Sequence, residues 1–123
     1  MINLMPNPVM QFQILSKDPE AAGKFYTNLF GWTIDTANPM GYRVIQTGSN
    51  DGIQGGIWPA PPQAQTFNQL FIAVEDVKGS AAKASELGAK ILVPPMMLPD
   101  GDEMAILQDP QGMSFGLMSQ RKK

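Results

Sequence analysis

The chain has 123 residues, a net charge of −2, 43% apolar residues and 16% charged residues. These values are typical of one globular domain of roughly 100–200 residues, and they exclude a disordered chain and a broad basic surface for nucleic acid. Cysteine and histidine are both absent. Their absence excludes disulfides, thiolate or imidazole catalysis, and metal sites built on those two residue types. With no signal-peptide pattern and no run of roughly 18 apolar residues, we expect a cytoplasmic protein without a membrane span.

The first predicted elements are a strand and a helix. In residues 9–15, Phe12 and Ile14 alternate with Gln11 and Gln13, the period of a strand with one face on a core. Asp18 is a helix-capping residue, and the proline after it suits the first helical position. Apolar residues then recur at helical spacing until a glycine ends the helix, and we expect its large aromatic residues to be core: Phe25 and Phe30.

Two further strands are predicted in the first half of the chain, at residues 42–47 and 53–58. The second strand contains Gly55 and Gly56. Adjacent glycines in a strand indicate a bulge, a bend or the close approach of a ligand. Residues 59–66 are rich in proline and glutamine and predict an extended linker.

The second half of the chain repeats this order of elements. Leu70, Ile72 and Val74 alternate with Gln69 and Phe71, which predicts a strand. Asp76 is expected to cap a helix that continues to residue 87, where a glycine follows. Three strands are then predicted, at residues 89–93, 104–108 and 113–118, and two adjacent prolines are expected to end the first of them.

The two halves have nearly constant spacing. Gln11 precedes Gln69 by 58 positions, and Asp18 precedes Asp76 by the same number. This repeat predicts an α+β fold in which two βαβββ modules form a curved mixed sheet, with helices on the outer face and a cup on the inner face. We therefore expect a single domain over residues 1–123, with module one at about 8–58, a linker at 59–66 and module two at about 67–119.

Several of these segments resemble the vicinal-oxygen-chelate superfamily, which contains glyoxalase I, extradiol dioxygenases and bleomycin-resistance proteins. The residues that carry the resemblance are 18–32, 74–77 (Val-Glu-Asp-Val), 86–89 (Glu-Leu-Gly-Ala) and 109–112 (Asp-Pro-Gln-Gly). Together they cover nearly the whole chain. The chain is most similar to glyoxalase-like proteins that lack an assigned reaction.

The resemblance also implies where a metal would bind, because four side chains converge in the cup of the metal-dependent members. In this sequence those positions fall on Gln11, Gln69, Gly116 and a residue near Gly56 to Trp58. None of them is a carboxylate or an imidazole, which divalent cations in proteins usually require. We therefore expect no tightly bound metal and no other cofactor.

The same positions predict a site for a small organic ligand. Glutamine amides can donate and accept hydrogen bonds, aromatic rings can stack on a flat ligand, and arginine can hold an anion. We expect Met104 to border the cup and make it adaptable. The candidate ligand-binding residues are Gln11, Gln13, Gln69, Phe71, Trp58, Tyr42, Arg43, Met104 and Gly116.

Three functions remain open at this point. The first is a small-molecule binding protein of the glyoxalase and bleomycin-resistance type. The alternative is a metal-dependent lyase, isomerase or dioxygenase with a degenerate site, in which Gln11 and Gln69 would hold a metal weakly and Glu103 or substrate oxygens would complete its shell. The third is a dimer with a structural or regulatory role. The resemblance implies a homodimer, and we expect neither a nucleic-acid nor a membrane partner.

Overall fold

The computed structural model describes residues 7–119, which contain two successive βαβββ units. The α+β fold and the repeated order of elements are therefore confirmed. The elements of the first unit are β1 (Val9–Ser16), α1 (Pro19–Phe30), β2 (Thr33–Asp35), β3 (Arg43–Gln46) and β4 (Gln54–Pro59). Those of the second are β5 (Phe67–Val74), α2 (Val77–Glu86), β6 (Lys90–Met97), β7 (Glu103–Gln108) and β8 (Ser114–Ser119).

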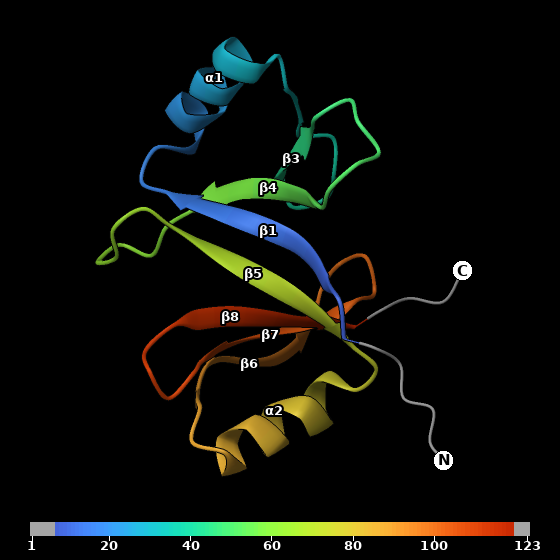
Figure 1. Cartoon of the computed structure of the whole chain (residues 1–123), viewed down its shortest axis with the longest axis vertical. Coiled ribbons are helices and arrows are strands. Elements are labelled where there is room, and N and C mark those ends of the chain that lie inside the picture. The colour runs from blue at the N-terminus through green and yellow to red at the C-terminus, as the bar shows by residue number, and fades with distance from the viewer. Residues whose placement is uncertain (1–6, 120–123) are drawn as a thin grey trace. The chain divides into compact units, whose positions relative to one another are not determined.

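Residues 11–69 form one compact body. Its strands lie in the order β2-β3-β4-β1, with β4 and β1 parallel and the other neighbours antiparallel. Helix α1 packs on one face of β4 (Figure 1). Ile14, Ile45 and Ile57 form the core between helix and sheet, with Phe12 and Tyr26 packed against them. The predicted alternation in β1 is confirmed, because Phe12 and Ile14 face the helix.

Helix α1 begins and ends as its sequence predicts. The Asp18 side chain accepts a hydrogen bond from the backbone N–H of Ala21, and Gly31 takes the left-handed conformation after the last turn. The prediction that Phe25 and Phe30 are core is wrong, because they are 58% and 57% exposed. The helix packs on the sheet through Ala22, Gly23 and Tyr26, and Phe25 and Phe30 lie outside this packing face.

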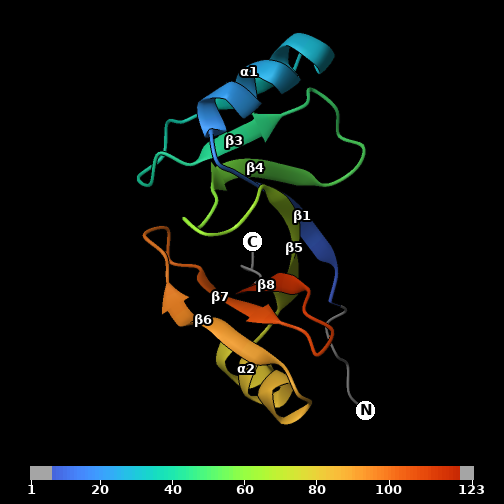
Figure 2. The same ribbon diagram turned by 90° about the vertical axis from the view of Figure 1, so that its left-hand side faces the viewer.

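The second compact body comprises residues 70–119 together with residues 7–10 at the start of β1. Its strands lie in the order β5-β8-β7-β6, with β5 and β8 parallel and the rest antiparallel. Figure 2 shows α2 against β6 and β7, as do the contacts. The core between α2 and this sheet is built from small and branched apolar side chains: Val74, Val77, Ala81, Ala105, Leu107 and Leu117.

Strand β6 is longer than its sequence predicts. The prediction that Pro94 and Pro95 end it is wrong, since the strand continues to Met97. Its pairing with β7 shifts register between Ile91 and Val93 and again between Val93 and Met96. A proline lacks the N–H that an inner strand needs, so it is tolerated at the edge of a sheet and at such irregularities. Strand β6 is the edge strand of its unit.

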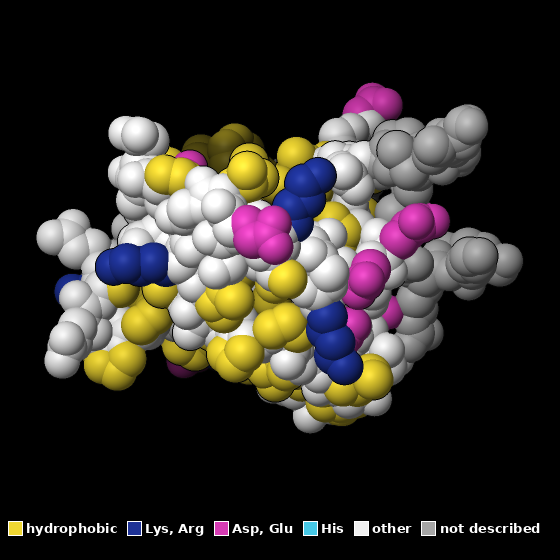
Figure 3. All heavy atoms as spheres, turned by 90° about the horizontal axis from the view of Figure 1, so that it is seen from below, with side chains coloured by type: hydrophobic (Ala, Val, Ile, Leu, Met, Phe, Trp, Pro, Cys, Tyr) yellow, Lys and Arg dark blue, Asp and Glu magenta, His cyan; other side chains and the backbone are white. Residues whose placement is uncertain are grey.

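The surface seen from the α2 end carries hydrophobic side chains between separate basic ones, and several acidic side chains lie near one another on its right-hand side (Figure 3). Within residues 7–119, no helix is long and apolar enough to cross a membrane. The predicted cup requires residues of both modules and stays a prediction.

Candidate functional site

The sheet of the first module has a second face, turned away from α1. Side chains alternate along a strand, so Gln11 and Gln13 lie on the face opposite Phe12 and Ile14. The register of β1 with β4 places Gly56 beside Gln13 and Trp58 beside Leu15 on that same face. These residues of module one share a surface with Tyr42 and with Gln69, which starts the second module in sequence but belongs to the same compact body. We call this surface the amide face: Gln11, Gln13, Tyr42, Gly56, Trp58 and Gln69.

Three polar side chains of the amide face form a hydrogen-bonded run. The Gln69 Nε2 donates to Gln13 Oε1 at 2.9 Å, and the Gln13 Nε2 donates to the Tyr42 hydroxyl at 3.4 Å. Gln69 is buried, with 6% of its surface exposed. Buried amides are usually hydrogen-bonded because an unpaired polar group inside a protein is costly. The run links β5, β1 and the segment before β3, so it fixes neutral donors and acceptors at one place.

An aromatic pair lies beside the run. The rings of Tyr42 and Trp58 have centroids 5.7 Å apart and planes tilted by 40°. The Tyr42 ring covers Gly56, where any Cβ would overlap it. Gly56 therefore leaves room for the Tyr42 ring to lie close to the strand. The glycine pair is thus approached closely by side chains of the protein itself. On the α1 face, Phe12 covers Gly55 in the same way.

Tyr42 is held in place by Asn38, a residue that our sequence reasoning missed. The Tyr42 N–H donates to Asn38 Oδ1 at 2.9 Å, and Asn38 Nδ2 donates to the Tyr42 carbonyl at 2.7 Å. The segment Asn38-Pro39-Met40-Gly41 is typical of a turn in which asparagine bonds to backbone groups ahead of it. That signal could have located Asn38 as the residue that positions Tyr42.

Burial changes the acid–base behaviour of Tyr42. Desolvation raises the pKa of its phenol above the ordinary value of 10.0, and the hydrogen bond with Gln13 opposes this by a smaller amount. Desolvation disfavours the charged form of an acid, so the phenol stays protonated at neutral pH. Tyr42 therefore presents a neutral hydroxyl and a flat ring on the amide face.

The second module has a corresponding face, turned away from α2. Phe71 is buried, and its ring covers its strand partner Gly116. Met104 and Met118 are partners across β7 and β8 and lie on that face as well. Three predicted residues of module two thus share one surface: Phe71, Met104 and Gly116. Their role in ligand binding stays a prediction.

Glu103 lies on the other side of β7. Its neighbours in alternation, Ala105 and Leu107, are in the α2 core, and its carboxylate is 3.9 Å from the Lys78 ammonium of α2. The carboxylate therefore faces α2, on the opposite side of the sheet from Met104. Arg43 likewise lies on the helix side of its own module, because its strand partner is the fully buried Ile57 of the α1 core.

The chain matches the family model described as Glyoxalase/Bleomycin resistance protein/Dioxygenase superfamily over residues 9–117. It is 29% identical over 109 residues to CFP32 of Mycobacterium tuberculosis, which carries the provisional name of a glyoxylase. That match covers 86% of this chain and 41% of the relative, so the chain spans less than half the length of this curated relative.

Solved structures share the fold, and two of them serve as examples. A hypothetical protein of Bacillus halodurans has a TM-score of 0.68 at 10% identity, with 97% of this chain and 98% of that chain covered. The methylmalonyl-CoA epimerase of Streptomyces coelicolor, solved with 2-nitronate-propionyl-CoA, has a TM-score of 0.60 at 17% identity, with 92% and 94% covered. At these identities the likeness is one of fold alone.

The four positions at which the resemblance implies a metal do not fit one here. Gly56 is the third residue of β4 and Gly116 is the third residue of β8, so the two glycines correspond. Each lacks a ligating group and is covered by an aromatic ring. The other two positions, Gln11 and Gln69, supply neutral amides, and a divalent cation needs ligands of greater charge and number. No cluster of three acidic, histidine or cysteine side chains suited to a metal occurs within residues 7–119.

Proposed function

We propose that this chain, which belongs to the Glyoxalase/Bleomycin resistance protein/Dioxygenase superfamily, binds a small neutral organic molecule on the amide face. One observation carries the proposal: the run from Gln69 through Gln13 to Tyr42 ends beside the Tyr42–Trp58 ring pair. Fixed amides next to aromatic rings suit a flat molecule that carries both a hydrogen-bond donor and an acceptor.

The roles of the residues follow from their chemistry. The Trp58 ring is 37% exposed, so it can stack on a ligand, while Tyr42 supports it from the side. Gln13 would pair with the polar group of the ligand, and the buried Gln69 would hold the Gln13 amide in one orientation. Gln11 lies on the same face and offers a further amide. No charged group belongs to this set, which favours a neutral ligand over an anion.

Benzamide is a suitable probe, because it combines an aromatic ring with an amide that can both donate and accept. We expect it to quench the fluorescence of Trp58 in a Trp32→Phe variant, with a dissociation constant on the order of 1 mM for so small a molecule. Toluene, which keeps the ring and lacks the polar group, is expected to bind at least about tenfold more weakly because it forms no hydrogen bonds.

Variants identify the site. Gln13→Ala is expected to weaken benzamide binding by about tenfold through the loss of its hydrogen bonds, whereas Gln108→Ala, at the C-terminal end of β7 in the other compact body, is expected to leave it unchanged. Equal affinity in both variants would overturn the assignment of the amide face. The enzyme alternative would gain support if a metal ion quenched Trp58 at stoichiometric concentration and Gln69→Ala abolished that effect.

A further inference from the structure

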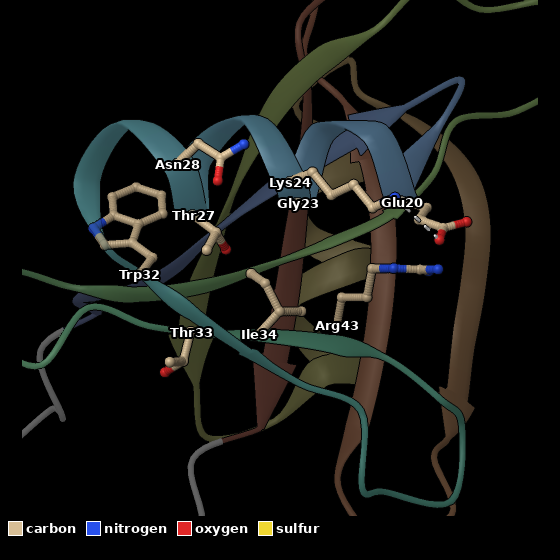
Figure 4. A pocket seen from close by; sticks show the side chains of 9 residues that line it. All are labelled: Glu20, Gly23, Lys24, Thr27, Asn28, Trp32, Thr33, Ile34 and Arg43. Carbon is tan, nitrogen blue, oxygen red and sulfur yellow. Dashed lines mark ion pairs between the residues drawn. The ribbon is translucent and has the colours of Figure 1, made fainter.

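A hollow of about 410 Å³ lies between α1 and strands β2 and β3, on the opposite side of the sheet from the amide face. Figure 4 shows side chains from the helix and from the sheet edge converging on it. Its walls combine charged, polar and apolar groups, among them Glu20, Lys24, Thr27, Trp32, Ile34 and Arg43. All of them belong to the compact body of residues 11–69.

Arg43 is the residue of this hollow whose positive charge favours the binding of an anion. It is the first residue of β3, is half-buried, and faces α1 together with its strand partner Ile57. Within residues 7–119 its guanidinium forms neither an ion pair nor a hydrogen bond. A guanidinium has five N–H donors in a planar fork that matches a carboxylate, and those of Arg43 are available to a ligand.

A second positive charge lies at the same end of the hollow. Figure 4 shows the Lys24 and Arg43 side chains both extending toward Glu20. The Lys24 ammonium and the Glu20 carboxylate are 3.9 Å apart, and both side chains are about three-quarters exposed. Such an exposed pair contributes little to stability, so Lys24 can turn to another anion at small cost. The balance of charge at this end is positive and favours a carboxylate.

The other end of the hollow is apolar. Trp32 lies at the far side from Arg43 in Figure 4, with Ile34 between them. The Trp32 ring is fixed by stacking on Tyr26 at a centroid distance of 5.5 Å and by contact with Phe30 at 5.1 Å. A preformed aromatic wall binds an apolar group without a large loss of side-chain entropy. The hollow therefore suits a molecule with a negative head and an apolar body.

We propose that this hollow is a second ligand site, which binds an aryl- or alkyl-substituted carboxylate. The carboxylate forms a two-pronged ion pair with Arg43 and is supported by Lys24. The apolar body lies along Ile34 toward Trp32. The proposal does not depend on the amide face, since the two sites share no side chain and face opposite sides of the sheet.

The test uses 3-phenylpropionate and the fluorescence of Trp32 in a Trp58→Phe variant. We expect saturable quenching, and we expect Arg43→Gln to weaken it by about tenfold, as the loss of a charge-assisted pair predicts. Lys90→Gln removes a charge in the other module and is expected to leave the affinity unchanged. The neutral amide 3-phenylpropanamide is expected to bind as weakly to the parent as the carboxylate binds to Arg43→Gln.

Three results would overturn the proposal. One is an unchanged affinity in Arg43→Gln, which would place the probe elsewhere. Another is equal affinity for the carboxylate and its amide, which would mean that charge has no part. The third is competition by inorganic phosphate at the same concentration as the probe, which would indicate a general anion site without the apolar end. Circular dichroism melting of Arg43→Gln verifies that the variant is folded.

Discussion

Three strand glycines of this protein lie beneath aromatic rings: Gly55 under Phe12, Gly56 under Tyr42 and Gly116 under Phe71. At each of these positions the missing side chain lets a ring lie flat on the sheet. The pair at Gly56 matters most for the proposed function, because the same tyrosine bonds to Gln13 and packs beside Trp58. The geometry of the amide face thus depends on the absence of a side chain at Gly56.

Gly56→Ala tests this dependence. Its Cβ would overlap the Tyr42 ring, so the ring must move, and we expect a loss of about 1–3 kcal/mol in the free energy of unfolding. Gly23→Ala is the matched control, because its Cβ would lie at an ordinary 3.6 Å from Ile34 Cγ1. Within a helix that change is expected to stabilise by about 0.5–1 kcal/mol. Urea unfolding measures both, and a loss of the same size in each would contradict the account.

The ionisation of Tyr42 gives a second prediction at this scale. In a Tyr26→Phe variant, Tyr42 is the remaining tyrosine, and tyrosinate absorbance should rise with a midpoint above pH 10.0 because burial raises the pKa of its phenol. The folded-state pKa then exceeds the unfolded value, so this group's contribution to stability is fully present below about pH 10. It is lost as the pH rises through the raised pKa. A midpoint at or below the ordinary value would show that the phenol is not desolvated.

At the scale of single elements, both helices are capped by aspartates that the sequence alone locates. Asp18 accepts from Ala21 N–H at 3.1 Å, and Asp76 accepts from Gly79 N–H at 3.0 Å. These positions are predictable because a short acidic side chain before a helix satisfies N–H groups that have no partner within it. The two faces of β1 were also predictable, since strict alternation leaves a single way to bury Phe12 and Ile14.

Asp76→Ala is expected to destabilise the protein by about 1 kcal/mol through the loss of the α2 cap. Asp76→Asn keeps an oxygen acceptor of the same reach and is expected to retain most of that stability. Thermal unfolding of the two variants separates the hydrogen bond from the charge. If Asn lowered the melting temperature as much as Ala, the cap would act through its charge and the hydrogen-bond explanation would fail.

Other features of the elements could not be predicted. Helical spacing groups Phe25 and Phe30 with the core, yet α1 packs through Gly23 and leaves those rings exposed. Which stripe of an amphipathic helix meets a sheet depends on how closely the backbones approach. The continuation of β6 through Pro94 and Pro95 likewise depends on its place at the sheet edge, which local sequence does not contain.

For the molecule as a whole, the repeat of 58 positions predicted two βαβββ modules, and the order of elements confirms them. For the candidate site, the sequence predicted which face of each strand carries the binding residues. Gln13, Tyr42, Trp58 and Gln69 were each named from sequence, but the hydrogen bond from Gln69 to Gln13 was not. The repeat relates Gln69 to Gln11, whereas the Gln69 Nε2 donates to Gln13 Oε1. Which side chains pair across two strands depends on the register of those strands. The spacing of residues in the sequence does not determine this register.

We propose that the amide face binds a neutral organic molecule and not a metal. One titration tests it most directly: heteronuclear NMR of the side-chain amides of Gln13 and Gln69 and the indole N–H of Trp58. We predict that benzamide shifts all three signals, and that one equivalent of Mn²⁺ leaves them sharp. The account would be contradicted if Mn²⁺ broadened the Gln69 signal at one equivalent while benzamide moved none of the three.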